Sequence, residues 1–274
     1  MIFLCTAMYN EAYPFIKQFN LRKDTSHQKF QVFKSEEITL IITGVGKLKG
    51  AIAVTYLLSN GTVNASDLLI NIGVCGTNNT NIPLGTTFLC NKIIDHETQR
   101  AFYPDILFTH PFKEASVETF STLVKDNNMD LEGDLVDMEA SGIYQSSTLF
   151  LKAHQVFFIK IVSDYLYTDN ISKDSISKSI EDQAIPILSW SHKVESGLLN
   201  NKKEFTEKEK EMLNQVVKNL KLSSTMEHQL KQLLKFYWLQ YGTVEEILKQ
   251  YMDIECQSKK EGKKHFEELR QKLI

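Results

Sequence analysis

Two apolar segments of this chain each run into a carboxylate at a point where a β-strand is expected to end. Residues 135–138 predict a short strand that turns into a helix at Glu139, and residues 156–162 predict a buried strand that ends in Ser163 and Asp164. α/β proteins expose functional side chains at such strand ends. The sequence therefore predicts an α/β protein with Glu139 and Asp164 at one site. Alternatively, Glu139 taken alone would be a helix cap or a partner of the helix dipole, and Asp164 would begin a loop.

Glycine-containing turns follow two further predicted strands. Residues 68–72 form a continuous apolar run, typical of a fully buried strand, which ends in residues 73–76, Gly-Val-Cys-Gly. Residues 43–47, Thr-Gly-Val-Gly-Lys, open a helix, but Lys49 stands where a dinucleotide-binding G-x-G-x-x-G motif needs its third glycine. We therefore expect these glycines to let the backbone approach a ligand closely, without forming a dinucleotide motif or a phosphate-binding P-loop.

The first third of the chain also predicts other elements of an α/β unit. Residues 2–7 predict an apolar strand, followed by a helix to about residue 19 with Glu11 in its first turn, where a helix-dipole role is the alternative to a functional one. Residues 30–43 predict a hairpin and residues 86–94 another strand. Residues 100–134 show no clear periodicity, which indicates a loop with short elements, where substrate selectivity commonly resides.

The composition changes near residue 200. A helix is predicted from residue 185 to residue 199, with its start near Asp182 and Pro186. Apolar spacing then predicts three more helices, at residues 204–220, 226–241 and 244–273. We therefore expect an α/β domain at residues 1–199 and an all-helical extension at residues 200–274. Residues 202–272 carry 15 Lys or Arg against 12 Asp or Glu, an excess more typical of a solvated helical face than of a nucleic-acid surface.

The overall composition excludes several classes of protein. The chain has 274 residues and a net charge of -3, which gives no footprint for nucleic acid over the whole molecule. No apolar run approaches the ~20 residues of a membrane span. The chain begins with an apolar segment and no basic leader, so we expect a cytoplasmic protein. The four cysteines and seven histidines are dispersed, so no metal site is expected.

Five segments together resemble the nucleoside phosphorylase and nucleosidase superfamily, and they are most similar to the methylthioadenosine/S-adenosylhomocysteine nucleosidases. These segments are Ala7-Met8-x-x-Glu11, Thr43-Gly44-Val45-Gly46-Lys47, Asn71-Ile72-Gly73-Val74-Cys75-Gly76, Val136-Asp137-Met138-Glu139-Ala140 and Val162-Ser163-Asp164. The resemblance implies a three-layer αβα fold around a mixed, twisted sheet. It also implies cleavage of the bond between ribose C1′ and a base nitrogen, without a cofactor, by a homodimer.

The resemblance assigns a chemical role to each acidic residue. Asp164 is the general acid toward the purine N7, and Ser163 orients it. Glu139 binds ribose hydroxyls and favours positive charge on the sugar, with Met138 beneath the ring. Glu11 activates water. Such a division suits the reaction, because the sugar becomes oxocarbenium-like while the base leaves with negative charge.

Further substrate contacts follow from position in the same motifs. They are Met8, Val45, Val74, Cys75 and Gly76. Phe120, in residues 116–120, stands in for an aromatic side chain that stacks on the base, or alternatively is a core phenylalanine.

The resemblance leaves three functions open. Hydrolysis of a purine or related nucleoside is favoured, because a phosphorylase must hold a phosphate dianion, usually with arginine, and the chain has only Arg22, Arg100 and Arg270, all outside the matched motifs. The alternatives are a phosphate-dependent phosphorylase and a nucleoside-binding protein with weak or no turnover. Departures from the family pattern motivate the last alternative. They are Val74, the residues that follow Asp164 (Tyr-Leu-Tyr), and a short segment between Asp95 and Asp137.

Overall fold

A computed structural model divides the chain into two compact units, Met1–Leu199 and Asn200–Ile274. The structure describes residues 1–126, 129–166, 173–200, 205–241 and 243–273. Among these residues, no helix combines the length and the apolar character that a membrane crossing requires.

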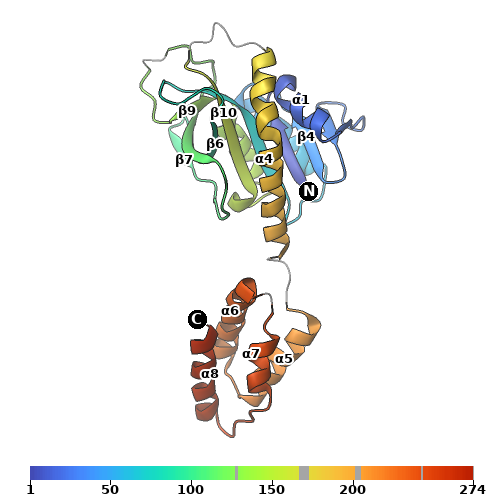
Figure 1. The fold of residues 1–274 in the computed structure, drawn as a ribbon, viewed down its shortest axis with the longest axis vertical. Helices are drawn as coiled ribbons and strands as arrows, with labels where there is room; N and C mark the ends of the chain where they lie inside the picture. The colour runs from blue at the N-terminus through green and yellow to red at the C-terminus, as the bar shows by residue number, and fades with distance from the viewer. Residues whose placement is uncertain (127–128, 167–172, 201–204, 242, 274) are drawn as a thin grey trace. The chain divides into compact units, whose positions relative to one another are not determined.

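A ten-stranded mixed sheet forms the centre of the first unit (Figure 1). Its strands are β1 (Ile2–Thr6), β2 (Arg22–Lys23), β3 (Gln31–Lys34), β4 (Ile38–Ile42), β5 (Leu68–Gly76), β6 (Thr87–Asp95), β7 (Arg100–Phe102), β8 (Lys113–Thr119), β9 (Leu135–Asp137) and β10 (Val156–Asp164). They pair in the order β10-β6-β8-β9-β5-β1-β4-β3-β2, and β7 pairs with β6. Because β10 also pairs with β5, the strands β5, β10, β6, β8 and β9 form a closed ring.

The parallel strands β1, β5 and β10 set the place of the site. Leu4 of β1 is in register with Ile70 of β5, and Ile70 is in register with Phe157 of β10. The carboxyl ends of these three strands therefore meet at one edge, where open α/β sheets bind ligands. β9 reaches the same edge, because Val136 pairs with Gly76 at the end of β5.

Among the described residues of the first unit, four α-helices and one 3₁₀ helix accompany the sheet. They are α1 (Tyr9–Gln18), α2 (Lys47–Ser59), α3 (Ala140–Ser147), α4 (Lys173–Asn200) and the 3₁₀ helix η1 (Ala153–Gln155). Residues of α1 and α4, such as Phe15 and Ile187, pack with Ile70 of β5 in one buried cluster. Residues of α2 and α3, such as Val54 and Ile143, belong to a second cluster. Two separate cores are expected when strands bury side chains in alternating directions.

The second unit is all-helical. It contains α5 (Glu207–Asn219), α6 (Ser224–Tyr241), α7 (Glu245–Met252) and α8 (Lys259–Leu273). Each helix contributes to one core, represented by Leu213, Leu230, Leu248 and Phe266. Buried Glu209 ties two of the helix starts together, since its carboxylate accepts hydrogen bonds from the backbone N–H groups of Thr206 and Val244.

The structure defines the short elements within residues 100–134, which the sequence predicted only as a loop with short elements. This stretch contains β7 and also the seven-residue β8, which pairs in parallel with β6. β8 is rich in polar residues, so it lacks the apolar pattern by which a strand is recognised in a sequence. One of them, Glu118, is buried, but its carboxylate accepts hydrogen bonds from the backbone N–H groups of Glu132 and Gly133. The hydrogen bonds to its carboxylate therefore offset the cost of burying Glu118 in this strand.

Two helix boundaries also differ from the prediction. α4 begins at Lys173 and continues through Pro186, because Ile180 and Ile187 bury a continuous apolar face that outweighs the hydrogen bond lost at proline. The predicted helix at residues 244–273 is two helices, α7 and α8. Asn219 holds the connection between them, donating from Nδ2 to the Met252 carbonyl over 2.6 Å.

We predict that Phe157→Ala lowers the free energy of unfolding of the first unit by about 3–5 kcal/mol. Phe157 is 1% exposed and meets Trp190 edge to face with ring centroids 5.0 Å apart, so truncation leaves a cavity in the core. Urea denaturation measures the change. Leu149→Ala, at a side chain that is 75% exposed, is the control, and an equal effect of the two substitutions would contradict this account of the core.

Candidate active site

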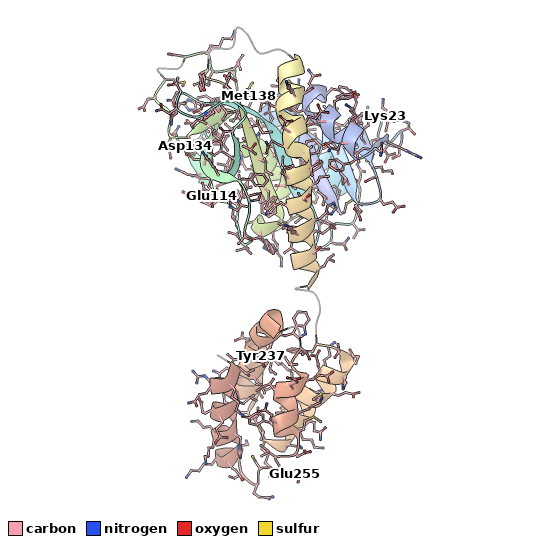
Figure 2. The ribbon with its side chains drawn as sticks, in the orientation of Figure 1. Lys23, Glu114, Asp134, Met138, Tyr237 and Glu255 are labelled. Atoms are coloured by element: carbon pink, nitrogen blue, oxygen red, sulfur yellow. The ribbon has the colours of Figure 1, made fainter. Side chains whose placement is uncertain are left out.

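A cavity of about 210 Å³ lies where the carboxyl ends of β1, β5 and β10 meet the turn between β9 and α3. Its lining includes ten of the eleven residues that the sequence proposed for the site. They are Met8, Glu11, Val45, Val74, Cys75, Gly76, Met138, Glu139, Ser163 and Asp164. Met138, labelled in Figure 2, belongs to the β9–α3 turn. Folding thus brings three carboxylates from distant parts of the chain to one cavity.

Glu11 reaches the cavity from the first turn of α1. Its Oε2 accepts hydrogen bonds from the N–H groups of Ala7 and Met8 over 2.8 and 2.9 Å, and its Oε1 accepts from the Val74 N–H over 3.0 Å. Gly73 permits this approach, since a Cβ at that position would lie 2.9 Å from Oε1. Burial raises the pKa of Glu11, whereas the three N–H donors and Lys160 oppose the rise.

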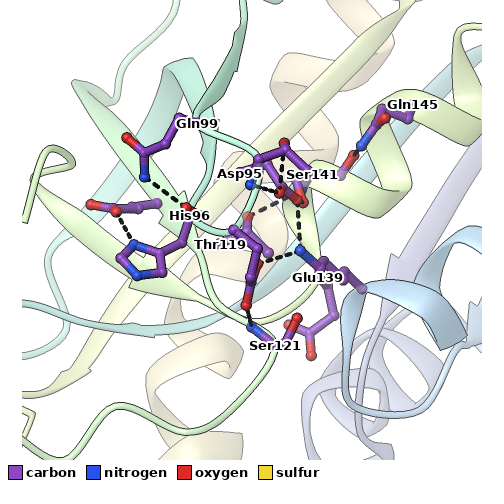
Figure 3. Close-up of polar contacts among 12 residues, drawn as sticks. Asp95, His96, Gln99, Thr119, Ser121, Glu139, Ser141 and Gln145 are labelled. Atoms are coloured by element: carbon purple, nitrogen blue, oxygen red, sulfur yellow. Dashed lines mark hydrogen bonds and ion pairs between the residues drawn. The ribbon is translucent and has the colours of Figure 1, made fainter.

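Glu139 occupies the position before α3 but does not cap the helix with its side chain. That function belongs to Asp137, whose Oδ2 accepts from the Ala140 N–H over 2.9 Å. The Glu139 side chain instead points away from Ser141 in Figure 3, and its Oε1 accepts from the Gly46 N–H over 2.8 Å. The cap interpretation of Glu139 therefore does not describe its side chain.

The ionisation of Glu139 is strongly perturbed. Burial raises its pKa to about 7, and the neighbouring Asp137 carboxylate adds to the shift while Lys160 opposes it. A carboxyl group with such a pKa changes charge near neutral pH.

A buried ion pair lies beneath these carboxylates. Lys160 of β10 is 1% exposed, and its Nζ lies 2.7 Å from Asp137 Oδ2. Although burial opposes its charge, the pKa of Lys160 is raised because Asp137 and Glu139 attract the ammonium group. Lys160 was given no role from the sequence. A lysine inside the predicted buried strand, four residues before Asp164, could have indicated a buried ion pair near the site.

Asp164 ends β10, and both of its carboxylate oxygens have hydrogen-bond donors. Ser163 Oγ lies 2.7 Å from Oδ2 and 3.2 Å from the Cys75 carbonyl oxygen, and the Leu166 N–H donates to Oδ1 over 2.9 Å. A carboxylate held on both sides has a fixed orientation toward the cavity.

A polar network holds the starts of α2 and α3, and Figure 3 shows its contact between Asp95 and Ser141. Asp95 Oδ2 accepts from Ser141 Oγ over 2.7 Å and pairs with Lys47 Nζ over 2.8 Å. Lys47 also pairs with Glu97. Because Lys47 directly follows Gly46, the donor to Glu139, this network fixes the carboxylate through the backbone.

Phe120 is the eleventh predicted residue and does not line the cavity. It is 4% exposed, stacks on His96 with ring centroids 3.9 Å apart, and packs with Val124 and Leu166. This packing favours the alternative of a core phenylalanine, and contact with a base stays a prediction.

Several lining residues were not proposed from the sequence. They are Ala7, Leu123, Val124, Val136, Asp137, Leu166 and Ile176. Leu123 and Val124 lie in the stretch without periodicity, and Ile176 belongs to the part of α4 that the predicted helix omitted. Ala7, Val136 and Asp137 stood within or beside the quoted motifs, so proximity to Met8 and Met138 was a usable signal.

The second unit contains a group that could hold a metal ion, the only one found among the described residues. Cys256, Glu261 and His265 each place one potential ligand atom within 4.8 Å of the others. Their dispersed spacing gave no recognised metal-binding pattern in the sequence.

Solved structures with this fold include nucleosidases. A 5′-methylthioadenosine/S-adenosylhomocysteine nucleosidase from S. pneumoniae is 20% identical with a TM-score of 0.57, and the match covers 69% of this chain and 97% of that one. The futalosine hydrolase of Helicobacter pylori is 15% identical with a TM-score of 0.57, covering 70% and 97%. A protein from Chlamydia trachomatis described as an MTAN, the abbreviation for 5′-methylthioadenosine/S-adenosylhomocysteine nucleosidase, is 22% identical with a TM-score of 0.53, and the match covers 69% of this chain and 97% of that one. At these identities the similarity establishes the fold.

Part of the chain also matches a known family of sequences. No curated protein matches the chain. Residues 4–122 match the family described as the Phosphorylase superfamily, and this range covers more than half of the first unit and includes the Glu11 and glycine-turn motifs. Over residues 4–122 the chain is therefore similar to the Phosphorylase superfamily, and this match supports the resemblance to nucleoside phosphorylases and nucleosidases that the sequence motifs predicted.

Proposed function

We propose that the unit Met1–Leu199 hydrolyses the N-glycosidic bond of a purine nucleoside or a related nucleoside, releasing the free base. The observation that carries this proposal is that Glu11, Glu139 and Asp164 line one cavity. The similar solved nucleosidases support it.

Each carboxyl group has a place in the proposed reaction. As the bond between C1′ and the base nitrogen breaks, its electron pair moves to the base, and Asp164 donates a proton or a hydrogen bond to N7. Glu139 binds the ribose hydroxyls and stabilises the positive charge that develops on the sugar. A water molecule attacks C1′ and transfers a proton to Glu11. The raised pKa of Glu11 suits a general base, because proton transfer is most effective when that pKa approaches the working pH.

The lining of the cavity supports hydrolysis over phosphorolysis. Phosphate dianions are usually held by arginine. Arg22, Arg100 and Arg270 are all exposed, and none of them lines the cavity. Lys160 is already paired with Asp137.

We also propose a layer arrangement and an oligomeric state for this chain, both from its resemblance to the superfamily. We infer the three-layer αβα arrangement for the first unit, supported by its two separate cores. We also propose a homodimer, which light scattering at several protein concentrations tests. The cytoplasmic location stays a prediction from the sequence.

We predict that Asp164→Asn lowers the rate of base release by about 10²- to 10⁴-fold, because the amide cannot supply the proton for N7. The measurement is release of free base from a panel of nucleosides, with and without phosphate, followed by mass spectrometry. Asp105→Asn is the matched control, since Asp105 is exposed and does not line the cavity.

Each other outcome of this assay identifies a different function. Turnover that requires phosphate and yields ribose 1-phosphate would establish a phosphorylase. Nucleoside binding without turnover in the parent protein, unchanged by Asp164→Asn, would establish a binding protein.

The perturbed Glu139 predicts a pH dependence of stability. The pKa of Glu139 is about 7 in the folded protein, whereas the ordinary pKa of a glutamate side chain is 4.5. The folded state therefore binds this proton more tightly than the unfolded state does. The stabilisation is present below the unfolded pKa and is lost as the pH rises through 7, by up to about 3 kcal/mol. We expect urea denaturation between pH 5 and pH 8.5 to show the parent protein losing stability relative to Glu139→Gln. A constant difference between the two proteins would contradict the raised pKa.

A further inference from the structure

Leu166 has a backbone conformation that is unusual for its residue type. Its φ of 64° lies in the left-handed region, which leucine rarely adopts. The residue is only 2% exposed and comes two positions after Asp164. Such strain persists only where the surrounding structure imposes it, and it is concentrated at functional sites.

Hydrogen bonds fix the turn that contains Leu166. Its own N–H donates to Asp164 Oδ1 over 2.9 Å, and the Asp164 carbonyl oxygen accepts from the Thr77 N–H over 3.1 Å. The residue before Leu166 is held as well, because the Tyr165 hydroxyl donates to the Ile82 carbonyl oxygen over 2.8 Å. Leu166 is therefore held in one place relative to Asp164.

The Leu166 side chain fills the space beside the Asp164 carboxylate. It packs with Phe120, Val124 and Val136 in a small apolar cluster. It also lies against Gly76, where a Cβ would be 2.4 Å from Leu166 Cδ2 and 3.0 Å from Asp164 Oδ1. Both Gly76 and Leu166 line the cavity, whose volume of about 210 Å³ is below the ~300–1,000 Å³ usual for small-molecule sites.

We propose that Leu166 is a specificity-determining residue that limits the size of the base at the edge facing Asp164. This inference rests on the proposed function, in which Asp164 meets N7 of a purine. On the edge of the purine that carries N7, the neighbouring positions are C8 on one side and the substituent on C6 on the other. Leu166 therefore selects purine nucleosides that carry no bulky group at these positions.

The length of the side chain is the variable that matters. Truncation to alanine removes the branched end that contacts Gly76 but keeps the backbone N–H that donates to Asp164. One methylene group more or less in an apolar pocket changes the ratio of kcat/KM between two substrates by about 10- to 200-fold. We therefore expect truncation of Leu166 to lower the discrimination against a bulkier base at least tenfold.

The test compares kcat/KM of the full chain for a 6-aminopurine nucleoside and its N6-benzyl analogue. Leu166→Ala is expected to raise the ratio of benzylated to parent substrate at least tenfold. Leu166→Gly should do the same while relieving the strained φ, so it serves if the alanine variant does not fold. Leu151→Ala, which truncates a buried leucine of another cluster, is expected to leave the ratio unchanged.

The two proposals fail in different ways. If no nucleoside is turned over, the proposed function fails, and Leu166 is tested through the dissociation constants of adenine and N6-benzyladenine measured by calorimetry. A rise of at least tenfold in the relative affinity for the benzylated base in a Leu166 variant supports the inference. A ratio that stays within twofold of the parent value in folded Leu166 variants overturns it, as does failure of both bases to bind the parent protein and the variants.

Discussion

The buried ammonium group of Lys160 is the charge on which the candidate site depends. Glu11, Asp137 and Glu139 are each less than a tenth exposed, and Lys160 contacts Asp137 directly while lowering the pKa of the other two. Burying carboxylates together is costly unless a cation or hydrogen-bond donors compensate them. One lysine cannot neutralise three carboxylates, so the site has an affinity for a proton or for positive charge. That is the charge which develops on the sugar in the proposed reaction.

The sheet turns this electrostatic arrangement into a fixed geometry. β10 supplies Lys160 and Asp164 at a spacing of four residues, so the cation lies within the strand and the acid at its end. β5 ends beside β10, and β1 ends beside β5, which places Glu11 and the turn at residues 73–76 at the same edge. Backbone N–H groups then orient Glu11 and Glu139, and backbone donors of this kind do not change with side-chain rotamers.

How far the sequence predicts this protein depends on the kind of signal. Continuous apolar strands such as residues 68–72, followed by glycine, were visible because burial on both faces leaves a simple pattern. Motif order placed Glu11, Glu139 and Asp164 together. Taken alone, Glu11 also fitted a helix-dipole role, Glu139 a helix cap or dipole partner, and Asp164 the start of a loop. β8 was missed because its buried Glu118 is satisfied by loop N–H groups that no local pattern reveals. The sequence marked the residues after Asp164 as a departure from the family pattern but did not place Leu166 in the site, because a left-handed leucine is set by tertiary packing.

Closure of the strand ring also governs how the sheet can meet other proteins. Strands β5, β10, β6, β8 and β9 each pair on both sides, so in the described part of the chain the pairing ends at the two-residue β2 and the three-residue β7. β2 consists of Arg22 and Lys23, both exposed. Short, charged edges offer little template for strand addition by another chain. The architecture that gathers the acidic residues thus also opposes edge-to-edge aggregation when the protein is concentrated.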